Sequence, residues 1–544
     1  MKYFFLYFNT LKHLKFKQFF YKIYYALVQK KPSKLKLNKI PQITLSNKWT
    51  IFNLNNRRIS ADYIANFLNY KKKLNLPCDW NDQSDSKLWT YNLHYFEDFT
   101  SIALHENKEF YSNYLDLWIK QNPACIGIGW EPYPTSLRIS NILKAGLSGF
   151  HLKDNHIKSL YIQSKFLFKN LEKHLLCNHY FVNLKALLFS AIIFNKTEWL
   201  VFVSDEILKE LDEQILSDGE HFELSPMYHA LILVDLLDIY NLCLSYSMNE
   251  LNELEKKINC LIPKMLRFLD LMTHGDGGLS FFNDSVDGIS PSTKKINEYA
   301  SLLGFITNDK NLNKVELNNL ASGYIVAIND QNKLIFDSAK IGPNYNPGHA
   351  HADTLSFELS IRKERVFVNS GISHYENDSA RLKQRGTMLH NTVQINNNNS
   401  TEVWSSFRVA KRADINFRSC KLNDEIAYIC GEHNGYKKFL RGTNHNRKLI
   451  FKQNELTIKD YLDGVFQDAT ARFYFHPYLK VFIKDNTINI EGQKFKLLGN
   501  LSNHKYRLIE SYFYPEFGKA IGNSCLEIDF ISNKNNISFQ WEYK

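Results

Sequence analysis

The stretch Gly348-His349-Ala350-His351-Ala352-Asp353-Thr354-Leu355-Ser356-Phe357 carries two histidines and a carboxylate within five residues and runs into a strand-like pattern. Apolar residues at 355, 357, 359 and 361 alternate with polar ones, which predicts a β-strand over 355–361. Residues i and i+2 share a face of an extended chain, so we expect His349 and His351 to point the same way. One could transfer protons and the other could hold a metal, although two loop histidines without a role would give the same pattern.

The sequence downstream of about residue 320 consists of short alternating runs separated by Gly, Asn and Asp turns. No helical period lies between these runs, and the pattern is typical of an antiparallel β-sandwich. The predicted strands are 323–329, 333–337, 355–361, 366–369, 392–395, 448–451, 455–460, 471–476, 479–483 and 487–490.

The sequence from about 60 to 285 is helical in pattern, and successive segments of about 12–20 residues with short polar joints predict helical hairpins stacked around an axis. The predicted helices include 156–175, 182–195, 199–215, 225–246 and 251–273. We therefore expect a basic, aromatic helical segment over 1–60, a helical domain over 61–300 and a β-sandwich domain over 301–544.

The composition describes a soluble globular chain of 544 residues with a net charge of +11. This charge favours an anionic partner, which could be an acidic polysaccharide, a nucleic acid or a membrane surface. The sequence has no zinc-finger spacing, no RNP-like signature and no phosphate-cradling Gly-rich loop, so we expect no nucleic-acid partner.

The N-terminal segment has a short apolar run that ends at Asn9, and basic residues rather than a small-residue cleavage site follow it. This pattern predicts no signal peptide and a cytoplasmic location, with a periplasmic or envelope-associated location as the alternative. No apolar run reaches the length of a transmembrane segment. Residues 1–45 could form a membrane-surface helix or a helix docked on the body of the protein.

Two polar pairs stand where helices of the first domain are expected to begin. Asn178 and His179 precede an apolar run, and Asn178 could simply cap that helix. Tyr228 and His229 follow Ser225 and Pro226, a plausible N-cap and first helical residue. The positive end of the helix dipole would then favour a Tyr228 phenolate, whereas a core-facing tyrosine and histidine would be the structural alternative.

Five blocks taken together resemble the heparinase II/III-like polysaccharide lyases. They are NHYFVNLKALLFSAIIF (178–194), ELSPMYHALILVDLL (223–237), GDGGLSFFNDS (275–285), GHAHADTLSFEL (348–359) and LHNTVQI (389–395). The resemblance spans about residues 88–480. It implies an α+β multidomain fold in which an incomplete (α/α) toroid packs against an antiparallel β-sandwich, with the active site between them.

The resemblance also implies β-elimination at a uronic acid. A base removes the C5 proton, an acid protonates the departing O4, and hydrogen bonds to the carboxylate stabilise the enolate-like species. Asn178 would neutralise the carboxylate, Tyr228 would be the acid and also a candidate base, and His349 would be the alternative base. The expected substrate-binding residues are His179, His229, Arg381 and Arg385, although Arg381 and Arg385 could be solvated surface arginines.

No cofactor is expected for the reaction, but the resemblance implies a structural metal site at His351, Asn369 and His390. Asn369 departs from the family pattern, because an amide oxygen is a poorer ligand for zinc than a carboxylate. Either these groups hold a divalent metal, zinc or calcium, or they form a hydrogen-bonded bracket without one.

The leading hypothesis is a lyase that cleaves a uronic-acid-containing anionic polysaccharide, in the metabolism of a bacterial surface polysaccharide. A uronate C5 epimerase would remove the same proton and return one to the opposite face, and a non-catalytic glycan-binding or assembly protein would keep only the fold. A 4,5-unsaturated product indicates the lyase, and solvent deuterium at C5 without cleavage indicates the epimerase.

Overall fold

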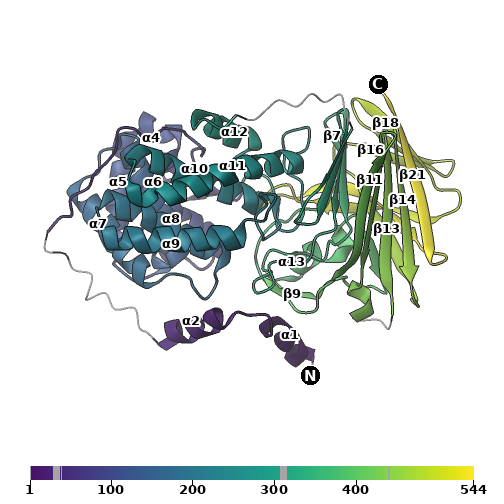
Figure 1. Cartoon of the computed structure of the whole chain (residues 1–544), viewed down its shortest axis with the longest axis horizontal. Coiled ribbons are helices and arrows are strands. Elements are labelled where there is room, and N and C mark those ends of the chain that lie inside the picture. The colour runs from purple at the N-terminus through teal and green to yellow at the C-terminus, as the bar shows by residue number, and fades with distance from the viewer. Residues whose placement is uncertain (1, 28–36, 38, 307–314, 439–441) are drawn as a thin grey trace.

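The computed structural model describes residues 2–27, 37, 39–306, 315–438 and 442–544, and it divides into a helical half and a half built of strands (Figure 1). This order confirms the predicted α+β fold with a helical toroid followed by antiparallel sheets. The helical part ends with α12 (Thr293–Leu302), and the strands of the second half begin with β3 (Glu316–Asn319).

The helical half forms one continuous apolar core. Its helices before α12 are α3 (Lys87–Tyr95), α4 (Ile102–Glu106), α5 (Lys108–Gln121), α6 (Pro132–Leu147), α7 (Asp154–Lys169), α8 (Cys177–Ile193), α9 (Thr197–Gln214), α10 (Pro226–Tyr246) and α11 (Asn252–Met272). A small hairpin, β1 (Ile64–Phe67) with β2 (Tyr70–Lys73), precedes them.

Helices α8 and α10 are apolar on nearly every face, which is the pattern of helices at the centre of a core. Helix α10 is long and apolar enough to cross a membrane, but 83% of its apolar window is buried inside the protein. It is therefore a core helix. The predicted cap is confirmed, because the Ser225 hydroxyl accepts from the Tyr228 N–H at 3.2 Å and Pro226 is the first helical residue.

Besides a two-stranded pair, the second half contains three larger sheets of antiparallel strands. Hydrogen-bonded neighbours follow the order β3-β4-β5-β6-β7 in one sheet and β19-β20-β15-β8 in another. In the largest sheet the order is β11-β12-β13-β14-β21-β18-β17-β16. Their inward side chains share one apolar core, as expected for packed sheets. The predicted strand 355–361 begins two residues later, as β6 at Phe357, and residues 348–356 form turns and irregular backbone rather than extended chain.

The bounds of these strands are as follows. The first sheet contains β4 (Tyr324–Asn329), β5 (Asn332–Asp337), β6 (Phe357–Ile361) and β7 (Glu364–Phe367), and helix α13 (Ser379–Gln384), β8 (Val393–Ile395) and the pair β9 (Val403–Ser405) and β10 (Arg408–Val409) follow it. The remaining strands are β11 (Ile415–Asn423), β12 (Ile426–His433), β13 (Asn444–Lys452), β14 (Glu455–Asp463), β15 (Ala469–Tyr474), β16 (Lys480–Lys484), β17 (Thr487–Glu491), β18 (Phe495–Asn500), β19 (Lys505–Phe513), β20 (Ile521–Asp529) and β21 (Lys534–Tyr543).

The two halves share a third apolar cluster, in which Phe268 and Met272 of α11 pack with Tyr324 and Val326 of β4. Two more helices, α1 (Lys2–Leu11) and α2 (Phe16–Leu27), lie along the outside of the molecule, beneath the junction of the halves in Figure 1. The apolar contact between α11 and β4 joins the halves beside the start of α10, where the candidate site lies.

Candidate active site

Three segments that are far apart in the sequence are joined by hydrogen bonds at the junction of the two halves. The Ser225 hydroxyl at the start of α10 donates to the Asp284 carbonyl at 2.6 Å. The Asp284 N–H donates to the His349 carbonyl at 3.0 Å. The His351 N–H donates to the Asn283 side chain at 2.9 Å, so residues 283–285 bind the HxH turn to the first turn of α10.

The Asp284 carboxylate is the centre of this arrangement, and it is fully buried. Arg381 donates to its Oδ1 at 2.5 Å and to its Oδ2 at 2.7 Å. His351 Nε2 lies 2.8 Å from Oδ1, and His349 Nδ1 lies 2.9 Å from Oδ2. Burial opposes ionisation, but Arg381 and the two histidines outweigh it and hold the pKa of Asp284 well below its usual range.

The His349 imidazole is oriented by this ionised carboxylate. An ionised carboxylate only accepts hydrogen bonds, so Nδ1 carries the hydrogen and Nε2 is left with its lone pair. Among the described residues no hydrogen bond to Nε2 is found, and 14% of the side chain is exposed. His349 Nε2 therefore lacks a partner among the described residues, on a ring that is partly exposed.

The Tyr228 ring stacks against this imidazole, with the ring centroids 3.9 Å apart and the planes inclined by 30°. Its hydroxyl lies 3.0 Å from the hydroxyl of Tyr375. Burial, together with Tyr375, raises the pKa of Tyr228 well above its usual value. The expectation that the helix dipole favours a phenolate is wrong, because burial outweighs it, and Tyr228 is a proton donor at neutral pH.

Asn178 lies on the helical side of the site. It does not cap α8, because the helix begins one residue earlier at Cys177 and no side chain caps it. Its amide Nδ2 instead donates to both carboxylate oxygens of Glu223, at 3.0 and 2.9 Å. This geometry lets one N–H be shared between the two oxygens, and no other acceptor for the amide is found among the described residues.

His179, the neighbour of Asn178, is the more exposed of the pair, with 34% of its side chain accessible. Its Nδ1 lies 3.2 Å from Glu172 Oε1, and its ring packs on Tyr133 with the centroids 4.5 Å apart. Burial opposes protonation of His179, but the Glu172 carboxylate outweighs it and raises the pKa of the imidazole. The cationic form of His179 is therefore more favoured than in a histidine without such a partner, and that form attracts an acidic ligand.

The loop that leads to His349 brings the two sides together. The Asn346 side chain donates to the Leu175 carbonyl, two residues before α8, at 3.1 Å. Glu223, the partner of Asn178, lies five residues before Tyr228. The structure thus brings Asn178, Tyr228 and His349 to one region, with direct contact between Tyr228 and His349 and an indirect link through Glu223 to Asn178.

Three of the expected substrate-binding residues are corrected by the structure. His229 is fully buried, and its Nε2 bonds to the Met265 carbonyl at 2.9 Å. Arg381 is fully buried against Asp284, and Arg385 is fully buried with its guanidinium bonded to the Ala350 carbonyl at 2.7 Å. These three side chains are therefore bonded to groups of the protein itself and are not exposed at its surface.

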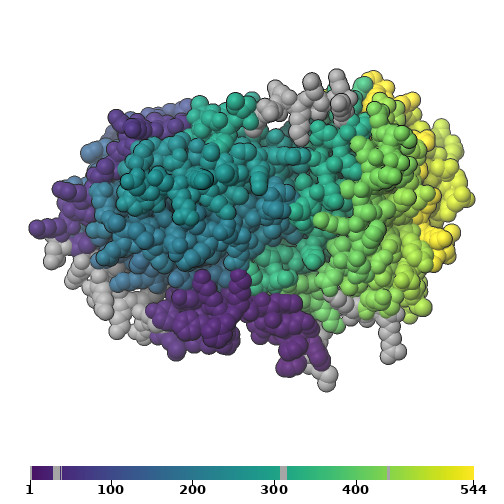
Figure 2. All heavy atoms as spheres, viewed as in Figure 1, coloured from purple at the N-terminus to yellow at the C-terminus, as the bar shows by residue number. Residues whose placement is uncertain are grey.

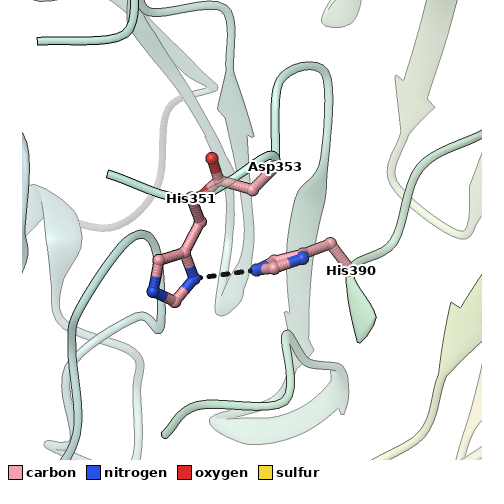
Figure 3. A group of neighbouring side chains, drawn as sticks. All are labelled: His351, Asp353 and His390. Carbon is pink, nitrogen blue, oxygen red and sulfur yellow. Dashed lines mark hydrogen bonds between the residues drawn. The ribbon is translucent and has the colours of Figure 1, made fainter. Parts of the chain in front are cut away.

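The expected metal-binding group changes in one member. Asn369 is buried, but its amide bonds to the Ser356 hydroxyl and to the Asn391 N–H, so it does not join the two histidines. Asp353 does instead: ligand atoms of His351, Asp353 and His390 lie within 4.8 Å of one another (Figure 3). The carboxylate that Asn369 lacks is therefore supplied by the HxH segment itself.

The donor atoms of this group fit a cation. His351 Nε2 faces the ionised Asp284, and His390 Nδ1 faces the Gly386 carbonyl at 2.8 Å, so both of these nitrogens carry hydrogen. Burial lowers the pKa of His351 to about 4 and also lowers that of His390, so both rings are neutral. Their remaining nitrogens then face each other as lone pairs 3.1 Å apart (Figure 3). Two nitrogens bound to one tetrahedral zinc lie roughly 3.3–3.4 Å apart, close to this distance.

Comparison with known proteins places this arrangement in a family. Residues 105–313 match the family model for the heparinase II/III N-terminus, and residues 318–523 match the heparinase II/III-like C-terminal model. The chain belongs to the heparinase II/III-like family.

Two curated members are heparin-sulfate lyases. The one from Pedobacter heparinus is 23% identical over 340 residues, which are 54% of this chain and 48% of that protein. The one from Bacteroides stercoris is 22% identical over 404 residues, which are 64% of this chain and 56% of that protein. The chain thus spans about half the length of the curated relatives it matches.

The solved structures confirm the fold. A crystal structure of heparinase III has a TM-score of 0.67 at 15% identity, covering 96% of this chain and 88% of its own. The heparan sulfate lyase HepC from Pedobacter heparinus has a TM-score of 0.57 at 16% identity, covering 85% of this chain and 77% of its own.

Several residues of this family member were missed by sequence reasoning. Asp284 and Glu223 stand inside quoted blocks, but nothing in their spacing reveals their partners 97 and 45 positions away. Tyr375 lies outside every block, and its contact with Tyr228 depends on the fold alone. Asp353 had a visible signal, because it follows His351 by two residues and ends the HxH segment.

Proposed function

We propose that this heparinase II/III-like protein is a polysaccharide lyase that cleaves an acidic, uronate-containing glycosaminoglycan by β-elimination. The observation that carries the proposal is the stacked pair of Tyr228 and His349, in which one member is a protonated phenol and the other exposes a basic nitrogen. The heparin-sulfate lyases among its relatives support an acidic glycosaminoglycan as the substrate class.

Substrate binding rests on the helical side of the site. The second N–H of Asn178 would donate to the uronate carboxylate, and the cation of His179 would attract the same group. Both interactions strengthen as charge develops on that carboxylate during C5 deprotonation. Such stabilisation of a developing charge is commonly the largest single contribution to an enzymatic rate.

Proton removal is assigned to His349. Its Nε2 takes the C5 proton, and the imidazolium that forms is stabilised by Asp284, which remains ionised because Arg381 neutralises it. A side chain positioned to transfer a proton in this way typically contributes about 10²–10⁴-fold to the rate.

Protonation of the leaving group is assigned to Tyr228. Its hydroxyl hydrogen passes to O4 as the C4–O4 bond breaks, and the electron pair of the C5–H bond forms the C4–C5 double bond. The hydrogen-bonded Tyr375 hydroxyl stabilises the phenolate that remains until solvent returns the proton. Tyr228 therefore acts as the acid and His349 as the base.

We also propose that His351, Asp353 and His390 hold a divalent ion with a structural role. Two imidazole nitrogens and one carboxylate suit zinc better than calcium, because calcium prefers oxygen ligands. When bound, the ion would fix the His351 ring by coordination, and His351 in turn donates to the Asp284 carboxylate that orients His349.

The experiment is a screen of heparan sulfate, heparin, chondroitin sulfate and alginate for the ultraviolet absorbance of a 4,5-unsaturated uronate. The proposal predicts absorbance with at least one glycosaminoglycan and its loss in the Tyr228→Phe protein. C5 deuteration without cleavage would instead indicate the epimerase. Glycan binding without any chemical change across the panel would indicate the non-catalytic protein, and either outcome contradicts the proposal.

A further inference from the structure

The N-terminal helices α1 and α2 are attached to the body through a few specific contacts. Thr10 Oγ1 of α1 donates to the Val409 carbonyl at 3.2 Å, and the Trp404 indole donates to Thr10 Oγ1 at 3.1 Å. On α2, Gln18 is buried and the Lys17 ammonium lies 5.2 Å from the centroid of the Tyr180 ring. One side of each helix is therefore fixed against the protein.

The opposite side of α2 is an apolar stripe. Its six members recur at helical spacing, so they share one face, and their exposed fractions range from 41% to 82%. They are Phe16, Phe19, Phe20, Ile23, Tyr24 and Leu27. An amphipathic helix of a globular protein normally turns such a face toward the core, but α2 turns it toward solvent.

Helix α1 extends this surface. Six of its large apolar side chains are exposed by 46% to 72%: Tyr3, Phe4, Phe5, Tyr7, Phe8 and Leu11. Twelve of the 33 exposed large apolar side chains in the described residues thus belong to these two helices. Figure 2 shows the helices as a ridge along the lower edge of the molecule. Such a concentration of exposed apolar side chains on two neighbouring helices indicates an interaction site.

The charge of the same segment is entirely positive. The first 61 residues of the sequence contain 11 lysines and two arginines and no aspartate or glutamate. Lys12, which follows α1, and Lys22, within α2, are exposed beside the apolar surface. Aromatic side chains combined with lysines are the composition of helices that lie in the interface of an anionic bilayer.

We propose that α1 and α2 form a docking surface for an anionic lipid bilayer, with the aromatic stripe inserted among the lipids and the lysines at the headgroups. A second copy of the chain fits this surface poorly, because its matching face carries the same positive charge and the two would repel. The bilayer surface offers both apolar contact and opposite charge.

The first test is flotation of the full chain with vesicles of phosphatidylglycerol and phosphatidylcholine, or of phosphatidylcholine alone. The wild type binds the anionic vesicles more strongly, and added salt weakens that binding. The variant Phe16→Ser/Phe20→Ser/Leu27→Ser lowers the partition coefficient at least about tenfold. The matched control Val465→Ser/Tyr478→Ser/Ile531→Ser changes side chains of similar exposure elsewhere and binds as the wild type does.

The second test separates charge from apolar contact. Lys12→Glu/Lys22→Glu lowers binding to anionic vesicles at least about tenfold and leaves binding to phosphatidylcholine vesicles unchanged. Failure of the wild type to bind either vesicle overturns the proposal. So does an equal loss in the control variant. Self-association that the serine variant abolishes, without vesicle binding, would assign the surface to a second copy and also overturns it.

Discussion

Two histidine–carboxylate pairs flank the candidate site, and they differ in how their charge is balanced. On the strand side, His349 bonds to Asp284, whose charge is neutralised by Arg381 at 2.5 and 2.7 Å. On the helical side, His179 bonds to Glu172, and among the described residues no lysine or arginine forms an ion pair with that glutamate. Burial opposes protonation of His179, but the unneutralised Glu172 carboxylate outweighs it and raises the pKa of His179.

The difference shows that a histidine–carboxylate pair does not define a role on its own. On the strand side, the imidazole keeps a second nitrogen without a partner among the described residues, which suits a base. On the helical side, the Glu172 carboxylate raises the pKa of the imidazole, which suits binding of an anionic substrate. Perturbed ionisation of this kind commonly marks functional sites.

Of the changes that test the difference between the two pairs, removal of Arg381 should have the largest effect, which is on stability. Arg381→Gln leaves the Asp284 carboxylate buried without its cation, and breaking such a pair typically costs about 3–5 kcal/mol. We expect a large fall in the urea midpoint of unfolding. The double variant Asp284→Asn/Arg381→Gln removes both charges and should recover part of the loss. A stability of Arg381→Gln equal to that of the wild type would contradict the assigned charge balance.

Removal of a bound metal should have the next largest effect, again on the strand side. If His351, Asp353 and His390 bind zinc, a free concentration one hundred times the dissociation constant stabilises the protein by about 2.7 kcal/mol. A chelator should therefore lower the melting temperature of the zinc-loaded protein. His390→Ala should be insensitive to chelator, whereas Asn369→Ala should keep the response. A chelator response that is kept in His390→Ala and lost in Asn369→Ala would instead identify Asn369 as the ligand.

Loss of the carboxylate on the helical side should weaken substrate binding. Glu172→Gln removes the charge that raises the pKa of His179, so His179 loses its proton at a lower pH than in the wild type. We expect KM at neutral pH to rise about tenfold, and the rise of KM with pH to begin earlier. The exposed Glu250→Gln is the control. An unchanged KM–pH profile in Glu172→Gln would show that His179 does not bind as a cation.

A third buried carboxyl group, that of Glu220, belongs to neither pair, and its replacement should change stability the least. It is fully buried, and burial raises its pKa well above the usual value. In the unfolded chain, Glu220 loses its proton above its ordinary pKa of about 4.3, whereas in the folded protein it keeps that proton. The contribution of Glu220 to stability therefore becomes less favourable as the pH rises past that value. Glu220→Gln should stabilise the protein by about 1 kcal/mol at pH 7 and by little at pH 4. A less stable variant at pH 7 would show that the carboxylate has a partner.

Much of the fold was predictable because periodicity is a local property. The helical and strand halves and the Ser225 cap follow from nearby residues, whereas Asn178, Tyr228 and His349 were proposed from the resemblance to a family. The burial of Arg381 was not predictable from nearby residues, because it depends on Asp284, which lies 97 positions earlier in the chain.

The metal-binding group was predicted only in part for the same reason. Asn369 stands where the family pattern has a ligand, but its bonds to Ser356 and Asn391 are tertiary contacts that no local pattern reveals. Tyr375 was equally invisible, since only the fold brings its hydroxyl to that of Tyr228. Contacts between distant segments decided each of these roles.

The roles of His349 as base and Tyr228 as acid are separated by incubating an acidic glycosaminoglycan in deuterium oxide with the wild type, Tyr228→Phe and His349→Ala. Mass spectrometry of the glycan reports deuterium at C5, and absorbance reports the unsaturated uronate. We expect Tyr228→Phe to exchange the C5 proton still, while its elimination rate falls at least about 10²-fold, and we expect His349→Ala to do neither. Elimination by His349→Ala at the wild-type rate would contradict the assignment of His349 as the base.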